Sequence, residues 1–162
     1  MAGKKIGKKR EGEATTGSCS VARAILIAAL LTIIGYVIHT VEAILTMNYY
    51  IDPAYFGVWS RVMMPAAGPP PMEFTYLSLA FGFAVALIYI WAYKVVQPAL
   101  EGADGWVKRG LLFGALLFLL GVVPGSLSLY LLINLPAAII GWWALSGLLI
   151  AFVDGVLIAK FC

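Results

Sequence analysis

Four apolar stretches of about 20 residues or more run through the chain, and they constrain its fold more than any other feature. A helix that crosses the hydrocarbon core of a bilayer needs about 20 predominantly apolar residues. Stretches of that kind occupy residues 22–47, 72–94, 110–133 and 137–160. The pattern predicts an all-α membrane protein whose four transmembrane helices form a bundle.

Composition supports the same fold class. Of the 162 residues, 62% are hydrophobic and 12% are charged, whereas soluble domains carry about 25% charged residues. A water-soluble chain this apolar could not cover its surface with polar groups. We therefore predict a disordered basic tail over residues 1–21 and one transmembrane domain over residues 22–162.

The distribution of Lys and Arg predicts the orientation. With the N-terminus inside, ten of the eleven basic residues fall on the cytoplasmic side and only Arg61 falls outside, as the positive-inside rule requires. We predict a multi-pass plasma-membrane protein with both termini cytoplasmic. A basic cluster in the tail is expected to meet anionic lipid headgroups, with no nucleic acid as partner. The cluster consists of Lys4, Lys5, Lys8, Lys9 and Arg10.

Cysteine and histidine are scarce. Cys19 and Cys162 flank the apolar region on the side assigned as cytoplasmic, where disulfides are rare, so we expect none. Two cysteines and one histidine cannot close a tetrahedral zinc site. We expect neither a metal nor a cofactor.

The loop after the first apolar stretch contains helix signals. Asp52 can cap a helix and Pro53 suits its first position, while Pro65 would end it. The intervening aromatic and apolar residues share one helical face, which predicts a short amphipathic helix over residues 53–64 in the membrane interface. The alternative is an ordinary loop with scattered aromatics. The shared face consists of Tyr55, Phe56, Trp59, Val62 and Met63.

Each apolar stretch carries a stripe of small and polar residues. Helices in lipid gain little from burying apolar surface, so small residues that permit close approach mark the faces that meet protein. The sequence leaves open whether these faces meet within one chain or between chains. The predicted packing glycines are Gly35, Gly82, Gly110, Gly114, Gly121, Gly125, Gly147 and Gly155.

Pro124 lies inside the third stretch and predicts a kink there, because proline removes a backbone hydrogen bond and clashes with the preceding turn. Ser126 and Ser128 could satisfy the freed carbonyl groups. A structural kink is one interpretation. The other is a broken helix that exposes backbone to a substrate.

Three ionisable residues are predicted at membrane depth, where charge is costly and often functional. His39 and Glu42 are three residues apart on one helical face and could form a proton relay, half of a metal site or a bracing pair. Asp154 lies near the opposite side of the membrane. The nearby cations Arg23, Lys94 and Lys160 predict a structural salt bridge to it.

A short resemblance adds to this interpretation. The segment 49–59, with Tyr49, Tyr50, Pro53 and Trp59, and the segment 109–114 are similar to features of small prokaryotic four-helix membrane proteins of unknown function. The resemblance covers residues 22–160. It implies the four-helix architecture and assigns a role to no residue.

Three functions remain open from the sequence. The leading hypothesis is a non-enzymatic bundle that forms a homo-oligomer or serves as an accessory subunit of a larger membrane complex. The alternative is a proton-coupled or small-solute transporter or channel that uses His39 and Glu42. A second alternative is a membrane-embedded enzyme acting on a lipid or quinone, although no phosphate loop, nucleophile elbow or metalloprotease motif is present.

Overall fold

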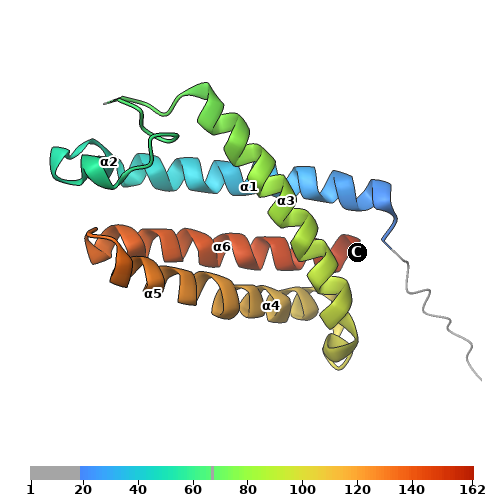
Figure 1. The fold of residues 1–162 in the computed structure, drawn as a ribbon. Coiled ribbons are helices and arrows are strands. Elements are labelled where there is room, and N and C mark those ends of the chain that lie inside the picture. Colours follow the sequence, from blue (N-terminus) through green and yellow to red (C-terminus); the bar gives the residue numbers. More distant parts are fainter. Residues whose placement is uncertain (1–18, 67) are drawn as a thin grey trace, which may run out of the picture.

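The computed structural model describes residues 19–66 and 68–162, and this part of the chain is helical without β-strands (Figure 1). Four of its helical segments are long and apolar enough to cross a membrane. The predicted all-α, four-helix class is therefore confirmed. The basic cluster of the N-terminal tail lies outside the described residues.

The four long segments follow the four apolar stretches closely. The first, second and fourth are α1 (Val21–Leu45), α3 (Met72–Val96) and α6 (Ala137–Phe161). The third segment is continuous but changes geometry, and shorter helices occupy the loops. The third segment comprises α4 (Gly105–Leu117), the π-helix η3 (Phe118–Val122) and α5 (Val123–Leu132), and the shorter helices are α2 (Met47–Ile51), η1 (Pro53–Val58) and η2 (Gln97–Leu100).

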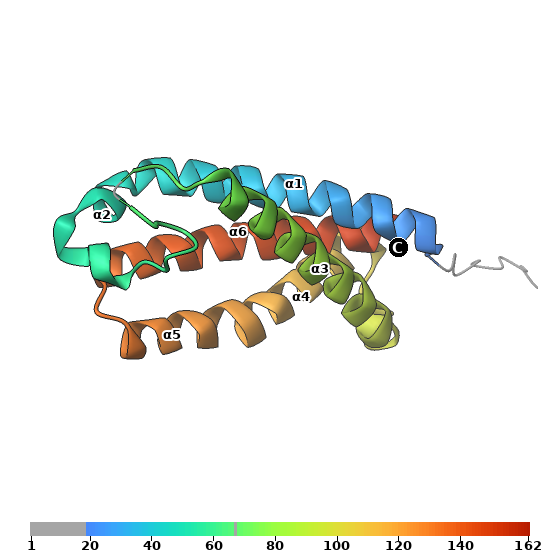
Figure 2. The same ribbon diagram turned by 45° about the horizontal axis from the view of Figure 1, so that its top comes forward.

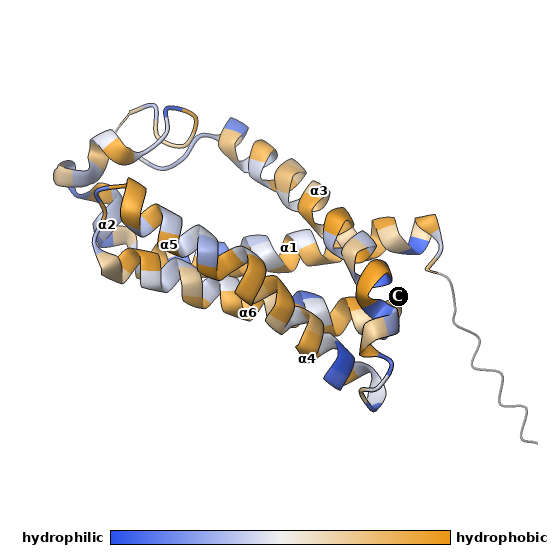
Figure 3. Cartoon of the chain, turned by 60° about the horizontal axis from the view of Figure 1, so that its bottom comes forward, coloured by the Kyte–Doolittle hydropathy of each residue, from blue (hydrophilic) through white to orange (hydrophobic). Residues whose placement is uncertain are grey.

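Helices α1, α4–α5 and α6 run side by side, and α3 crosses α1 and α6 obliquely (Figures 1 and 2). The most extensive contact joins α4 to α6, which form an antiparallel hairpin. We call the end with Val21 and Phe161 the terminal end, and the opposite end, with α2 and η1, the loop end. Apolar residues predominate along the long helices (Figure 3), and many of their large apolar side chains are exposed, as expected for helices surrounded by lipid.

The main core lies toward the terminal end. Side chains from α1, α3, α4 and α6 meet there, and the ring of Tyr93 packs edge-on against Phe113 at a centroid distance of 5.1 Å. Such edge-to-face pairs add to the stabilisation that burial provides. The buried helical residues of this cluster include Ile27, Ala28, Leu31, Ala86, Ile90, Tyr93, Phe113 and Ile158.

Glycine allows α4 and α6 to approach each other at backbone distance. A Cβ atom on Gly110 would lie 2.5 Å from the Cα atom of Val156, and one on Gly114 would lie 2.6 Å from the carbonyl oxygen of Ala151. A Cβ atom on Gly155 would overlap the carbonyl oxygen of Gly110. No side chain fits in these positions without separating the two helices.

The other glycines lie in looser surroundings. Gly82 faces a methyl group of Thr32, at 3.3 Å from the position of its missing Cβ, and Gly147 faces Val122 at 2.8 Å. The same positions on Gly35, Gly121 and Gly125 have no neighbour within 4 Å. The predicted packing glycines therefore divide into those that contact a neighbouring helix and three that face open space.

The third long segment loses regular α-geometry immediately before Pro124. The π-helix η3 spans Phe118–Val122, and the segment follows a curved path (Figure 2). Proline lacks the N–H group that would bond four residues back, which favours a local π-turn. Among the described residues, the structure records no hydrogen bond from the hydroxyl groups of Ser126 or Ser128 to the freed carbonyls.

Cys19 and Cys162 form a disulfide, contrary to the expectation from the sequence. Helices α1 and α6 are antiparallel and have 25 residues each, so the start of α1 and the end of α6 lie at the same level. This arrangement brings the two Cα atoms to 4.8 Å. The expectation rested on the rarity of disulfides in the cytoplasm, whereas the short distance between Cys19 and Cys162 follows only from the packing of α1 against α6.

The helix expected over residues 53–64 is shorter and tighter than predicted. It is the 3₁₀-helix η1, Pro53–Val58, in which Asp52 Oδ1 accepts a hydrogen bond from the Ala54 N–H at 2.9 Å. The cap and the position of Pro53 are thus as predicted. The helix ends at Val58 because Trp59 adopts an extended backbone and its ring stacks on Tyr50.

Candidate functional site at Glu42

Glu42 lies on α1, three residues before the helix ends at Leu45. This spacing places Glu42 about 5 Å along the helix axis from the loop end. The residue is 6% exposed. Its Oε1 atom accepts a hydrogen bond from the Thr46 hydroxyl at 2.8 Å, and the same hydroxyl lies 2.8 Å from the Glu42 carbonyl oxygen. Thr46, itself buried, therefore holds one carboxylate oxygen and leaves Oε2 free.

His39 lies beside Glu42 but makes only a loose contact with it. The distance from His39 Nδ1 to Glu42 Oε2 is 4.0 Å, and the His39 side chain is 58% exposed. A hydrogen bond between such groups requires about 3 Å. The predicted His39–Glu42 pair is thus adjacent in space, yet the imidazole faces outward while the carboxylate faces inward.

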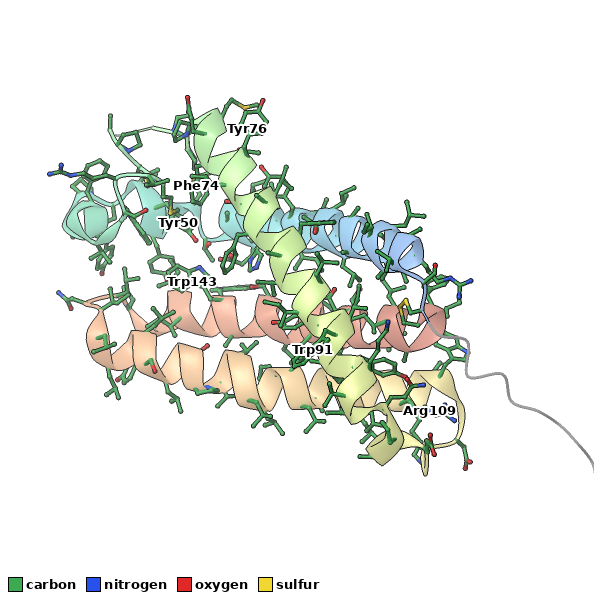
Figure 4. The ribbon with its side chains drawn as sticks, turned by 45° about the vertical axis from the view of Figure 1, so that its right-hand side comes forward. Tyr50, Phe74, Tyr76, Trp91, Arg109 and Trp143 are labelled. Carbon is green, nitrogen blue, oxygen red and sulfur yellow. A yellow bond between two sulfur atoms is a disulfide. The ribbon has the colours of Figure 1, made fainter. Side chains whose placement is uncertain are left out.

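Aromatic residues close the loop end next to Glu42. The indole N–H of Trp143 donates a hydrogen bond to the Tyr50 hydroxyl at 3.0 Å, and the two side chains point toward each other between α2 and α6 (Figure 4). The ring of Trp59 stacks on Tyr50 at 4.8 Å and meets Trp143 edge-on at 6.3 Å. Burial raises the pKa of Tyr50, and the nearby negative charge of Glu42 raises it further. The phenol is therefore neutral at physiological pH.

A cavity of about 400 Å³ lies between α1 and α6 with Glu42 in its wall. This volume falls within the range of about 300–1,000 Å³ that is typical of small-molecule sites. The wall is almost entirely apolar, and Glu42 is the only ionisable residue among those that line it. The lining residues are Ile38, Val41, Glu42 and Leu45 from α1 and Trp142, Leu145, Ser146, Leu148, Leu149 and Phe152 from α6.

Asp154 lies apart from this cavity, in the half of the bundle near the terminal end. It is 5% exposed, and its Oδ1 atom has no hydrogen-bond partner in the described part of the chain. Burial of such a polar atom without a hydrogen-bond partner is costly.

The predicted salt bridge of Asp154 is wrong for residues 19–66 and 68–162, where Glu42 is the only acidic residue with a basic side chain within 4.0 Å. The Lys94 ammonium donates instead to the Cys19 carbonyl oxygen at 3.1 Å. The Lys160 ammonium lies over the ring of Trp106 at 5.2 Å. Cations near the terminal end thus satisfy backbone and aromatic groups and leave Asp154 unpaired.

The three predicted ionisable residues therefore do not form one site. Glu42 lies about 31 Å along the axis from the start of α1, and Asp154 lies about 10 Å from the end of α6. The two carboxyl groups are thus separated by about 20 Å along the bundle axis. In the described residues, no three His, Cys, Asp or Glu side chains gather as metal ligands.

Comparison with protein-family models, with curated proteins and with solved structures finds no match to this chain. The chemistry of the site therefore rests on its own geometry. The sequence pointed to Glu42 but not to the cavity beside it. It also did not predict the contact between Tyr50 and Trp143, which lie 93 positions apart in the chain.

Proposed function

We propose that this chain is a non-enzymatic subunit of a membrane assembly, formed with a second copy of itself or with another membrane protein. The observation that supports this most directly is the open face of η3 and α5. Gly121 and Gly125 lie four residues apart there, and Ser128 follows on the same face, all three exposed. Helices in lipid associate through such small residues, because these residues permit backbone contact.

The contrast with α4 strengthens this proposal. Gly110 and Gly114 have the same spacing, and both lie against the backbone of α6. Gly121 and Gly125 repeat the spacing about two turns further along the segment, and the positions of their missing Cβ atoms have no neighbour within 4 Å. No helical residue of α5 is buried in the single chain. A second helix on this face would give α5 the kind of contact that α4 already has.

The proposal includes a location in the plasma membrane with both termini in the cytoplasm. The two termini of the helical bundle lie at the same end, where Cys19 and Cys162 meet. Most basic residues near helix ends also belong to that end, including Arg23, Lys94 and Lys160. Such a bias favours the cytoplasmic side. The Cys19–Cys162 disulfide is of a kind that is rare there, so the proposed orientation rests on the basic residues alone.

Cross-linking in intact membranes, followed by purification, tests the assembly. We expect wild-type protein to yield a defined dimer or a complex with one partner. Replacement of both glycines by leucine (Gly121→Leu with Gly125→Leu) should reduce that species at least fivefold, because leucine holds the helices apart. The helical content should remain unchanged, since both sites are open in the single chain.

Leu127→Ala provides a matched control, because Leu127 is exposed on α5 but lies about 140° around the helix from the face of Gly121 and Gly125. It should leave the cross-linked species intact. A wild-type protein that stays monomeric in the membrane without a cross-linked partner contradicts the proposal, and so does a double variant that assembles normally.

A second candidate function is proton-coupled or small-solute transport through Glu42, and the cavity beside this carboxylate favours it. Purified protein in liposomes should then move an organic cation or protons, and Glu42→Gln should abolish the flux. Unchanged flux in that variant rejects the candidate. An enzyme acting on a lipid or quinone has less support, because the single histidine of the chain is not among the residues that line the cavity.

A further inference from the structure

The cavity beside Glu42 opens on the side of the bundle. Its rim residues Val41, Leu45, Leu145 and Leu149 are each more than half exposed. All belong to α1 or α6, within the segments that are apolar enough to cross a membrane. In a bilayer this rim would meet acyl chains, so a ligand would enter from the hydrocarbon region.

The shape of the cavity suits one apolar chain. Along α6 the lining extends from Trp142 to Phe152, which is about 15 Å of helix axis. Beyond Glu42, Ile38 and Leu148 continue the apolar wall toward Phe152. The polar end of the cavity therefore lies near the loop end of the bundle, and its apolar end lies toward the middle of the membrane.

At the polar end of the cavity, the Glu42 side chain provides a hydrogen-bond acceptor and a negative charge. Thr46 occupies Oε1 of Glu42, but Oε2 lies 4.0 Å from the closest His39 nitrogen and can accept another donor. Within the described residues, His39 is the only basic residue within 4.0 Å of this carboxylate. A buried carboxylate with so little compensation gains strongly from a cationic partner.

The Trp142 indole lines the same end of the cavity. Indole faces attract ammonium groups through their quadrupole, and this attraction increases where water is excluded. A carboxylate and an indole at the head of an apolar cavity are complementary to an organic ammonium ion. An anionic head would be repelled by Glu42, and a neutral alcohol would gain only a hydrogen bond.

We propose that this cavity binds a single-chain amphiphile with a protonated amine head. The ammonium group donates to Oε2 of Glu42 and lies against Trp142, and the chain extends along α6 toward Phe152. This binding site goes beyond the proposed assembly and does not depend on it, because none of the lining residues belongs to η3 or α5.

Isothermal titration calorimetry tests the proposal with the full chain in phosphatidylcholine nanodiscs. Octylammonium should bind saturably at one site per chain, and 1-octanol, which has the same tail, should bind at least tenfold more weakly. Glu42→Gln should weaken octylammonium binding at least tenfold. Glu73→Gln is the matched control and should change nothing, because Glu73 is an exposed carboxylate at the start of α3.

Leu149→Trp keeps the test decisive if Glu42→Gln does not fold. It fills the cavity from the exposed rim without changing any charge, and we expect at least a tenfold loss of octylammonium binding. Normal binding in a folded form of either variant overturns the proposal, and so does equal affinity of the wild type for 1-octanol. Competition by added phosphatidylethanolamine would overturn the single-chain assignment, since this lipid has an ammonium headgroup but two acyl chains.

Discussion

The half of the bundle near the terminal end is closed, whereas the half near the loop end is open. Near the terminal end, glycines bring α4 and α6 into backbone contact, the main core joins four helices, and a disulfide links Cys19 to Cys162. Near the loop end, aromatic residues pack over the buried residues Leu135, Ile139 and Ile140. In the same half, however, α5 buries no residue and a cavity opens between α1 and α6 on the side of the bundle.

The difference between the two halves follows from side-chain size at equivalent contacts. Where α4 presents Gly110 and Gly114, α6 presents Gly155 and Ala151, and no side chain separates the helices. Across the cavity, α1 and α6 present bulky groups such as Leu45, Trp142 and Leu145. Large side chains hold these helices apart and leave space between them. The same small set of residue types thus produces a closely packed half and a half that contains a cavity.

Removal of the disulfide should have the largest effect on stability, because this bond closes a loop of 143 residues at the terminal end. Cys162→Ser should lower the free energy of unfolding by about 3 kcal/mol. Unfolding in mixed micelles by sodium dodecyl sulfate, monitored by circular dichroism, measures the change. Reductant should reproduce it in the wild type and have no effect on the variant. A wild type insensitive to reductant would show that the bond contributes nothing to this closure.

Gly114→Ala should be the next most damaging change, because its methyl group would lie 2.6 Å from the Ala151 carbonyl oxygen. Forced separation of packed helices costs about 1–3 kcal/mol, so we expect a loss of about 2 kcal/mol in the same assay. If this variant is as stable as the wild type, backbone contact does not hold the terminal end together.

Trp143→Phe should have a smaller effect, because it removes the hydrogen bond to the Tyr50 hydroxyl but keeps an aromatic ring. We expect a loss of about 1 kcal/mol in the same assay. Tyr50→Phe should give a loss of similar size, and a double variant that adds no further loss would confirm that the two residues act through one bond.

Gly121→Ala should have the smallest effect and the opposite sign. Its methyl group meets nothing within 4 Å in the single chain, and alanine is favoured over glycine in a helix by about 0.5–1 kcal/mol. Monomeric protein should therefore gain about 0.5 kcal/mol. A loss comparable to that of Gly114→Ala would mean that the open half is packed after all.

The fold was largely predictable because each long helix is encoded locally by its own apolar stretch. Pro124 likewise predicted a disturbance in the third stretch, and Asp52 with Pro53 predicted the start of η1. The length of η1 was not predictable, since it depends on Trp59 stacking against Tyr50 and packing near Trp143 of a distant helix.

The candidate site was predictable only in part. The cost of charge in lipid pointed to Glu42 and Asp154, but their surroundings depend on how helices pack. Lys160 could have reached Asp154 by length alone, yet it lies over Trp106. The disulfide was not predicted for a similar reason. The periodicity within each helix does not specify that the start of α1 and the end of α6 lie side by side.

The two membrane-embedded carboxyl groups offer the most direct test of the central claim, which is that the loop-end half is open and the terminal-end half is closed. Both residues are nearly inaccessible to water, at 6% exposure for Glu42 and 5% for Asp154, but only Glu42 is among the residues that line the cavity. A lipid-soluble aryl diazirine, whose photogenerated carbene inserts regardless of the protonation state of a carboxyl group, can be applied to the protein in nanodiscs and its adducts located by peptide mass spectrometry. The account predicts rapid modification of Glu42 and little modification of Asp154. Equal modification of both residues, or preferential modification of Asp154, would contradict it.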